Sequence, residues 1–200
     1  MSSRERIDAA ALKLLADHGY EGLSMQSLAD EVGLHKSTLF HHYKSKAEIA
    51  ERVVEGVLTR LVERTTPRLS RDPPSLDDLV AAAQDLVDYF AGEPAAAKLL
   101  LRVVLAPAEG PLSINRPDHP LTQLLTTLVT WFERARGAGV IRWVRIRHTL
   151  FDLMGLMVFH PATAATMTYI AGPTPFAPEE REKRKEEVAA FLRGALSPSA

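Results

Sequence analysis

A basic run without any acidic side chain extends from Leu34 to Ala47 of this 200-residue chain. Its positive or titratable groups are His35, Lys36, His41, His42, Lys44 and Lys46. Ammonium, imidazole and hydroxyl groups donate hydrogen bonds to phosphates and to base edges, and a phosphate backbone favours such a local imbalance of charge. The whole chain carries a formal net charge of only −1, so the signal is local. The run therefore predicts a contact with nucleic acid.

Two short helices and a tight turn are expected to position this run. Ser24 is a good N-cap, and the helix after it repeats apolar residues at helical spacing until Gly33 ends it. A second short helix is expected at about Lys36–Tyr43, with Leu39 and Tyr43 on its inward face. The opposite face carries Ser37, Thr38, His41 and Lys44. A solvated basic turn occurs in other helical bundles too, but the helix lengths, the glycine turn and the capped helix that follows favour a DNA-reading helix-turn-helix.

Residues 24–46, which read SMQSLADEVGLHKSTLFHHYKSK, resemble the DNA-binding motif of TetR-type transcriptional regulators, and the resemblance covers about residues 4–55. It implies a phosphate contact for Ser24, contacts to base edges or nearby backbone for Lys36, Ser37, Thr38 and His41, and a phosphate contact for Lys46. The full DNA-binding set that we expect is Ser24, His35, Lys36, Ser37, Thr38, Phe40, His41, His42, Tyr43, Lys44 and Lys46.

Two positions depart from the family pattern. Ser37 stands where the family often has glycine, and Phe40 where it often has tyrosine. Phe40 has no hydroxyl to donate to a phosphate, so it offers only apolar contact, for example with a thymine methyl group. Packing at the edge of the small core is an equally good interpretation of Phe40.

The expected fold is all-α, and the resemblance implies an N-terminal three-helix helix-turn-helix domain and a C-terminal helical bundle for ligand binding and dimerisation. Helical periodicity runs through the whole chain, and no segment shows the alternation of a strand. We predict domains at 1–47 and 48–200, with a connecting helix over 45–66 that begins at the pair Ser45 and Glu48. Prolines in 67–74 mark the junction. The first helix is expected to begin at Ser2 and to stop at Gly19. The later helices are expected over 75–92, 95–105, 121–136, 142–159 and 179–196, with a long loop over 107–120 and a proline-containing link over 161–178.

The C-terminal helices supply apolar material for the inducer cavity that the resemblance implies. The candidate ligand-binding residues are Phe90, Leu100, Val104, Leu125, Trp131, Phe132, His148 and Asp152. Core packing explains the apolar ones equally well. His148 and Asp152, four apart on one helix face, suit an ion pair, a cavity wall or two metal ligands, but no third ligand is visible and no metal is predicted. We expect a small, largely apolar effector.

Two further expectations concern charged groups near the C-terminus. His160 is expected to cap the end of its helix, where the charged imidazole is favoured. The run from Glu179 to Glu187 is expected to be a solvated helical face. The region 154–159 and the late apolar stripe of the last helix are candidates for the four-helix dimer interface that the resemblance implies.

Composition and motifs exclude several classes of function. The chain has no cysteine, which rules out thiol nucleophiles, zinc-cysteine sites and iron-sulfur clusters. No glycine-rich phosphate loop, nucleophile elbow or carboxylate-histidine cluster is present, so we predict neither an enzyme nor a cofactor. No secretory signal opens the chain, and the most apolar stretch, 150–159, is about half the length of a membrane span, so we expect a cytoplasmic protein without a membrane partner.

The sequence therefore predicts a sequence-specific DNA-binding transcriptional regulator, a repressor that a small-molecule effector releases from a double-stranded operator. Twofold symmetry is expected, because a compact DNA reader gains affinity from two half-sites about 34 Å apart. The alternative is a helical ligand-binding or adaptor module with little DNA affinity, which the missing hydroxyl at Phe40 keeps open.

Overall fold

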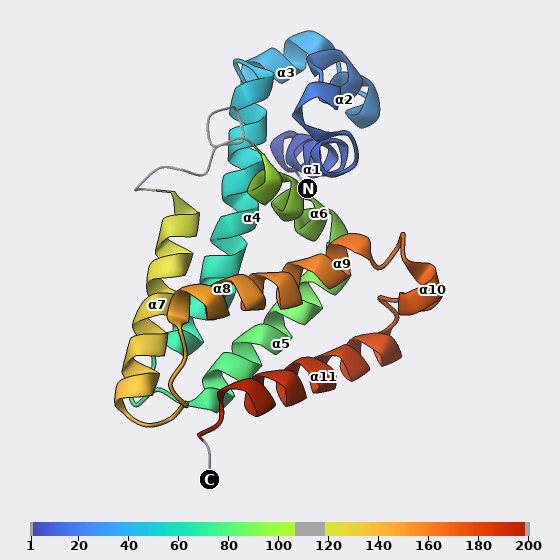
Figure 1. Cartoon of the computed structure of the whole chain (residues 1–200). Coiled ribbons are helices and arrows are strands. Elements are labelled where there is room, and N and C mark those ends of the chain that lie inside the picture. The colour runs from blue at the N-terminus through green and yellow to red at the C-terminus, as the bar shows by residue number, and fades with distance from the viewer. Residues whose placement is uncertain (1, 107–118, 199–200) are drawn as a thin grey trace.

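The computed structural model describes residues 2–106 and 119–198, and all regular structure in these two segments is helical (Figure 1). This confirms the all-α prediction. The elements are α1 (Ser3–Gly22), α2 (Met25–Val32), α3 (Lys36–His42), α4 (Lys46–Leu69), α5 (Leu76–Gly92), α6 (Pro94–Leu105), α7 (Pro120–Gly137), α8 (Ile146–Met154), the π-helix η1 (Gly155–Phe159), α9 (His160–Thr163), α10 (Thr168–Ala171) and α11 (Pro178–Leu196). Most of the loop predicted over 107–120 lies outside the described residues.

The helices α1, α2 and α3 gather at one end of the molecule around the start of α4 (Figure 1). Their inward side chains are fully buried in one apolar core, which includes Ile7, Leu28, Leu39 and Ile49. Helix α1 begins with the predicted capping box, in which the Ser2 hydroxyl accepts from the Glu5 amide and the Glu5 carboxylate accepts from the Ser2 amide. The helical conformation is interrupted at Gly19, where the sequence predicts the stop, because its φ of 72° and ψ of −174° are not helical. One more helical turn follows this kink and ends at Gly22.

The turn between α2 and α3 has the geometry that the sequence predicts. The Ser24 hydroxyl caps α2 by accepting from the Ser27 amide at 2.9 Å. At the other end Gly33 adopts a left-handed conformation with φ 65° and ψ 38°. The Leu34 amide then donates back to the Ala29 carbonyl at 3.0 Å, which closes the helix end as glycine-terminated helices commonly do. The turn therefore depends on a residue without a Cβ atom.

Helix α4 runs from the N-terminal helices to α5 and α7 (Figure 1). It ends at Leu69, beyond Pro67, where the sequence predicted a stop at about Thr66. A proline inside a helix removes one amide donor, and its ring crowds the carbonyl four positions earlier, so it usually bends or ends the helix. The turn continues because the Ser70 amide still donates to the Thr66 carbonyl at 2.9 Å.

The remaining helices bury a second apolar core between α5, α7 and α11, which includes Val87, Trp131, Phe132 and Val188. Helix α6 is not buried on all sides as its composition suggested, because Leu105 at its end is 76% exposed. The helix predicted over 142–159 begins only at Ile146, since the Arg142 amide donates instead to the Leu196 carbonyl at 2.9 Å. No described helix is long and apolar enough to cross a membrane.

A pair of glycine substitutions tests the turn of the helix-turn-helix. Gly33→Ala forces a left-handed conformation on an L-residue and should lower the free energy of unfolding by about 1 kcal/mol. Gly56→Ala lies inside α4, where a Cβ meets nothing within 4 Å, and should raise it by up to about 1 kcal/mol. Urea unfolding of the two variants measures both changes. An unchanged or raised stability for Gly33→Ala would contradict the turn.

Candidate functional site

The outer face of α3 is the exposed part of the basic run. The side chains of Lys36, Ser37 and His41 are exposed, Thr38 is half-buried, and Lys44 is exposed just beyond the helix. His35 is exposed before the helix and His42 is half-buried within it. Phe40 is 49% exposed, so half of its ring remains available for apolar contact. The exposed hydroxyl of Ser24 is engaged in capping α2.

The sequence analysis placed Tyr43 among the side chains expected to contact DNA, but the structure buries it. Its side chain is only 1% exposed, because it fills the core between α3 and α1. Its hydroxyl donates to the Asp8 carboxylate and accepts from Nε of Arg4 at 3.3 Å. Burial, then the hydrogen bond to Asp8, raises the pKa of Tyr43. The ring therefore serves to hold α3, and the sequence-based assignment is corrected.

Asp8 is the centre of a small polar network beneath α3. Besides Tyr43 it accepts from Nε of Arg52 on α4 at 3.1 Å. This hydrogen bond raises the pKa of Arg52. One carboxylate of α1 therefore ties the end of α3 to α4, and fixes the orientation of the exposed face.

Lys46 is held against the corner between α1 and α2. Its ammonium lies 3.3 Å from the Tyr20 carbonyl oxygen, 4.2 Å from the centre of the Tyr20 ring and 3.8 Å from the Glu21 carboxylate. The side chain remains partly exposed. Any phosphate that it binds must share this ammonium with the end of α1.

A second set of contacts joins α1 to α6. Arg102 donates to the carbonyl oxygens of Ala16 and Asp17, each at 2.7 Å, and Lys98 pairs with the Asp17 carboxylate at 3.0 Å. These carbonyls lie just before the kink at Gly19, where helical partners are lost. The sequence analysis singled out neither cation, because a basic residue on an apolar helix gives no sign of which distant carbonyls it meets.

The predicted ligand-binding residues are scattered over the C-terminal helices. Trp131 and Phe132 are fully buried in the second core and Leu100 is buried in the first. Val104 and Leu125 are 43% and 41% exposed, and His148 and Asp152 are exposed. No group of three or more potential metal ligands occurs in the described part of the chain. Of the eight residues, only Phe90 lines the pocket described next.

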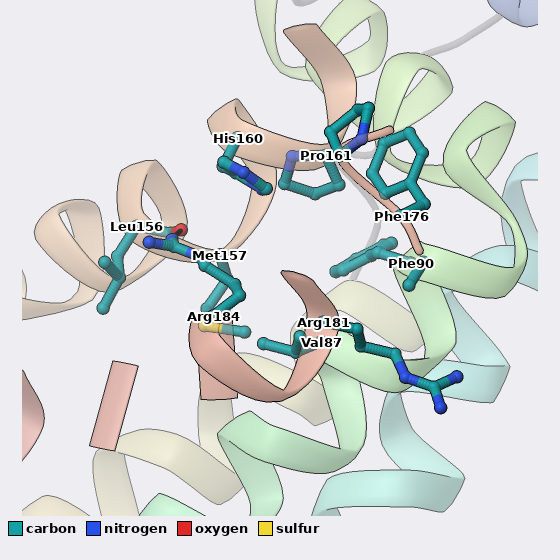
Figure 2. A pocket seen from close by; sticks show the side chains of 11 residues that line it. Val87, Phe90, Leu156, Met157, His160, Pro161, Phe176, Arg181 and Arg184 are labelled. Atoms are coloured by element: carbon teal, nitrogen blue, oxygen red, sulfur yellow. Dashed lines mark hydrogen bonds between the residues drawn. The ribbon is translucent and has the colours of Figure 1, made fainter. Parts of the chain in front are cut away.

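That pocket, here called the α5–α11 pocket, lies between α5, η1, α9 and α11 (Figure 2). It encloses about 330 Å³ of empty space, partly open to solvent. The residues that line it are Val87, Phe90, Ala91, Leu156, Met157, His160, Pro161, Pro175, Phe176, Arg181 and Arg184. Sequence reasoning missed all of these but Phe90, since they come from four segments that only the fold brings together.

His160 is not the helix cap that the sequence suggested. The helical path continues from α8 through η1 into α9, so His160 lies inside it and half-buried at the pocket. Burial, then the charge of Arg184, lowers the pKa of His160 below its ordinary value. Both causes disfavour the charged imidazole, which is the opposite of the predicted charged cap.

Arg184 is the charged group next to it. It lies half-buried on α11 and its Nη2 donates to the Leu156 carbonyl at 2.7 Å. Burial lowers the pKa of its guanidinium. The sequence analysis expected the run from Glu179 to Glu187 to be a solvated face of α11, but Arg184 in this run lines the pocket.

Comparison with known proteins agrees with the helix-turn-helix geometry. Residues 7–53 match the model of bacterial regulatory proteins of the tetR family. The tetracycline repressor protein class C of Escherichia coli is 37% identical over 65 residues, which are 32% of this chain and 30% of the repressor. The chain spans about a third of the length of the first curated relatives it matches, between 30% and 44%.

Solved structures agree over the whole fold. The ketosteroid transcriptional regulator KstR2 of Mycobacterium tuberculosis has a TM-score of 0.78 at 16% identity, with 99% of this chain and 96% of that chain covered. AibR, solved in complex with isovaleryl coenzyme A and operator DNA, has a TM-score of 0.73 at 19% identity, with 98% of each chain covered. The chain therefore shares its overall helical fold with these two regulators. The resemblance to the tetR family in sequence lies in residues 7–53, which form the helix-turn-helix and the start of α4.

The lowered pKa of His160 predicts how stability depends on pH. Because the folded pKa lies below the unfolded value of about 6.5, the unfolded chain binds more protons in this range. The contribution of His160 to the free energy of unfolding is fully present above its unfolded pKa and is lost as the pH falls through its folded pKa. Between pH 8 and pH 5, wild type should therefore lose more stability than His160→Gln.

Urea unfolding at each pH measures this difference, and NMR titration of the His160 ring checks its cause. His148→Gln, at an exposed position on α8, is the control and should retain the wild-type pH dependence. If His160→Gln lost as much stability as wild type, the lowered pKa of His160 would be contradicted.

Proposed function

We propose that the chain is a sequence-specific DNA-binding transcriptional regulator, a repressor that a small-molecule effector releases from its operator. The observation that carries this proposal is the acid-free face of α3, exposed at Lys36, Ser37 and His41 while Leu39 is fully buried beneath it. Donors of this kind on the second helix of a helix-turn-helix reach base edges in the major groove. Operator DNA in the AibR structure supports the same use of the fold.

The proposed assembly is a homodimer. A single α3 of seven residues spans few bases, and a twofold dimer presents two such helices to two half-sites. Large apolar side chains are exposed on the C-terminal helices, at Phe151 (69%), Phe159 (54%) and Phe191 (55%). Such side chains gain free energy when a partner covers them. In this proposal residues 1–47 read DNA, and residues 48–200 bind ligand and dimerise.

The proposed release is a shift between two conformations. Arg102 and Lys98 attach α6 to α1, so a movement of α6 displaces the helix against which α3 is packed. An effector that binds better to the displaced form lowers operator affinity by the difference between its two affinities. The role is regulatory rather than catalytic.

The salt dependence of DNA binding tests the proposal. The full chain is titrated against the DNA upstream of its own gene, at 50 to 200 mM salt. Each phosphate contact costs about 0.9 log units of affinity per log unit of salt, so a dimer with roughly 6–10 contacts loses about 10³- to 10⁵-fold. Absent or salt-insensitive binding would instead support a helical adaptor module with little DNA affinity.

Two substitutions separate base reading from phosphate binding. His41→Ala removes an exposed donor of the α3 face and should change the preferred bases, with a cost of about 1–3 kcal/mol at the sites it reads. Lys44→Ala should weaken all sequences alike and lower the salt slope by about 1. Competition binding with a randomised half-site measures both.

Lys183→Ala is the matched control, because Lys183 is an exposed cation on α11 that pairs with Glu179 and Glu180. It should bind DNA as wild type does. If His41→Ala and Lys44→Ala also bind like wild type, the assignment of the α3 face is wrong.

A further inference from the structure

We propose that the α5–α11 pocket binds a small carboxylate, or a similar monoanion, that carries an apolar chain. This deepens the proposed function, since it names the chemical class of the effector, and it rests on that function only for its regulatory consequence. The binding itself follows from the geometry of the pocket (Figure 2).

The walls of the pocket are apolar. Phe90, Met157, Pro161 and Phe176 face it from α5, η1, α9 and the segment before α11 (Figure 2). Its empty space of about 330 Å³ includes space that is open to solvent. An apolar chain would lie along the open part of the pocket, against the aromatic rings.

Arg184 supplies the charge that selects an anion. Among the described residues no carboxylate lies within 4.0 Å of its guanidinium, whose hydrogen bond within the chain goes to the Leu156 carbonyl at 2.7 Å. A guanidinium has five N–H donors, so donors remain for a ligand. No acidic side chain lines the pocket. The Glu187 carboxylate favours the charged guanidinium from beyond salt-bridge distance, but burial outweighs it. A half-buried cation without a salt-bridge partner is costly, and a bound carboxylate relieves that cost through charge-assisted hydrogen bonds.

The neighbouring cations of α11 are already paired. Arg181 lies 3.2 Å from the Asp88 carboxylate, and Figure 2 shows its guanidinium directed away from the pocket. Lys185 pairs with Asp88 at 3.0 Å and with Glu182 at 3.2 Å. Arg184 therefore differs from these neighbours in having no carboxylate partner.

The π-helix explains how Arg184 is held in position. In a π-helix the Leu156 carbonyl would accept from the amide five residues later, which belongs to Pro161. Proline has no N–H, so Arg184 supplies the missing donor. The hydrogen bond fixes the guanidinium before any ligand arrives, and His160 on the next turn adds an imidazole to the same wall. Such preorganisation lowers the cost of binding.

Isothermal titration of the full chain with sodium octanoate and with octanamide tests the proposal in the absence of DNA. The two probes share a chain and differ in charge. Wild type should bind octanoate at least tenfold more tightly than octanamide, a difference of 1.4 kcal/mol. Arg184→Gln should abolish that preference, and Arg193→Gln should keep it, because Arg193 is an exposed arginine of α11 paired with Asp77.

Melting curves show whether each variant is folded. If Arg184→Gln does not fold, Phe176→Ala is the second variant that tests the pocket. It should weaken the binding of both probes alike and leave the preference for octanoate intact. Equal binding of the two probes by wild type, binding of neither, or a preference that survives in folded Arg184→Gln overturns the proposal. Because DNA affinity is measured separately without octanoate, failure of the proposed DNA function leaves these results unaffected.

Discussion

A helix of seven residues has little stability of its own in water, and α3 is such a helix. The orientation of its outer face depends on the burial of Leu39 and Tyr43 in the first core, where α3 contacts α2. The apolar contact holds the helix down, and the Asp8 carboxylate fixes its far end by accepting from Tyr43 and Arg52. Asp8 thus acts on α3 from another helix, beneath the exposed face of the basic run.

The N-terminal helices were predictable because their signals are local. Ser2 with Glu5, Ser24 and Gly33 each act within one turn of the chain, and each has the geometry that the sequence predicts. The sequence-based predictions were wrong where a residue interacts with a part of the chain that is distant in sequence. Tyr43 was assigned to DNA although its spacing with Leu39 also marked it as inward, and only the position of Asp8 on α1 shows where its hydroxyl goes. Pro67 failed to end α4 because the cost of one missing hydrogen bond is small beside the packing of that helix on α5 and α7.

The α5–α11 pocket could not have been read from the sequence for the same reason. Arg184 lies in a charged run typical of a solvated helix, and nothing nearby in the chain reveals that its guanidinium meets a carbonyl 28 residues earlier. His160 precedes a proline, which usually marks a helix end, but here the helical path passes through it. Of the predicted ligand-binding residues, those with the strongest apolar character, Trp131 and Phe132, are the ones that the second core uses fully.

The pocket and the helix-turn-helix are joined through one continuous core. Phe90 lines the pocket and also packs in the first core, together with Leu100 of α6 and Ile7 of α1. Ala162, next to the pocket residue Pro161, belongs to the same core. Close-packed interiors respond to a new occupant by shifting whole elements rather than by compressing. In the proposed regulation, an occupant pressed against Phe90 and Pro161 would act on the packing around α6, and the hydrogen bonds from Arg102 would pass a shift of α6 to the carbonyls of α1 just before Gly19.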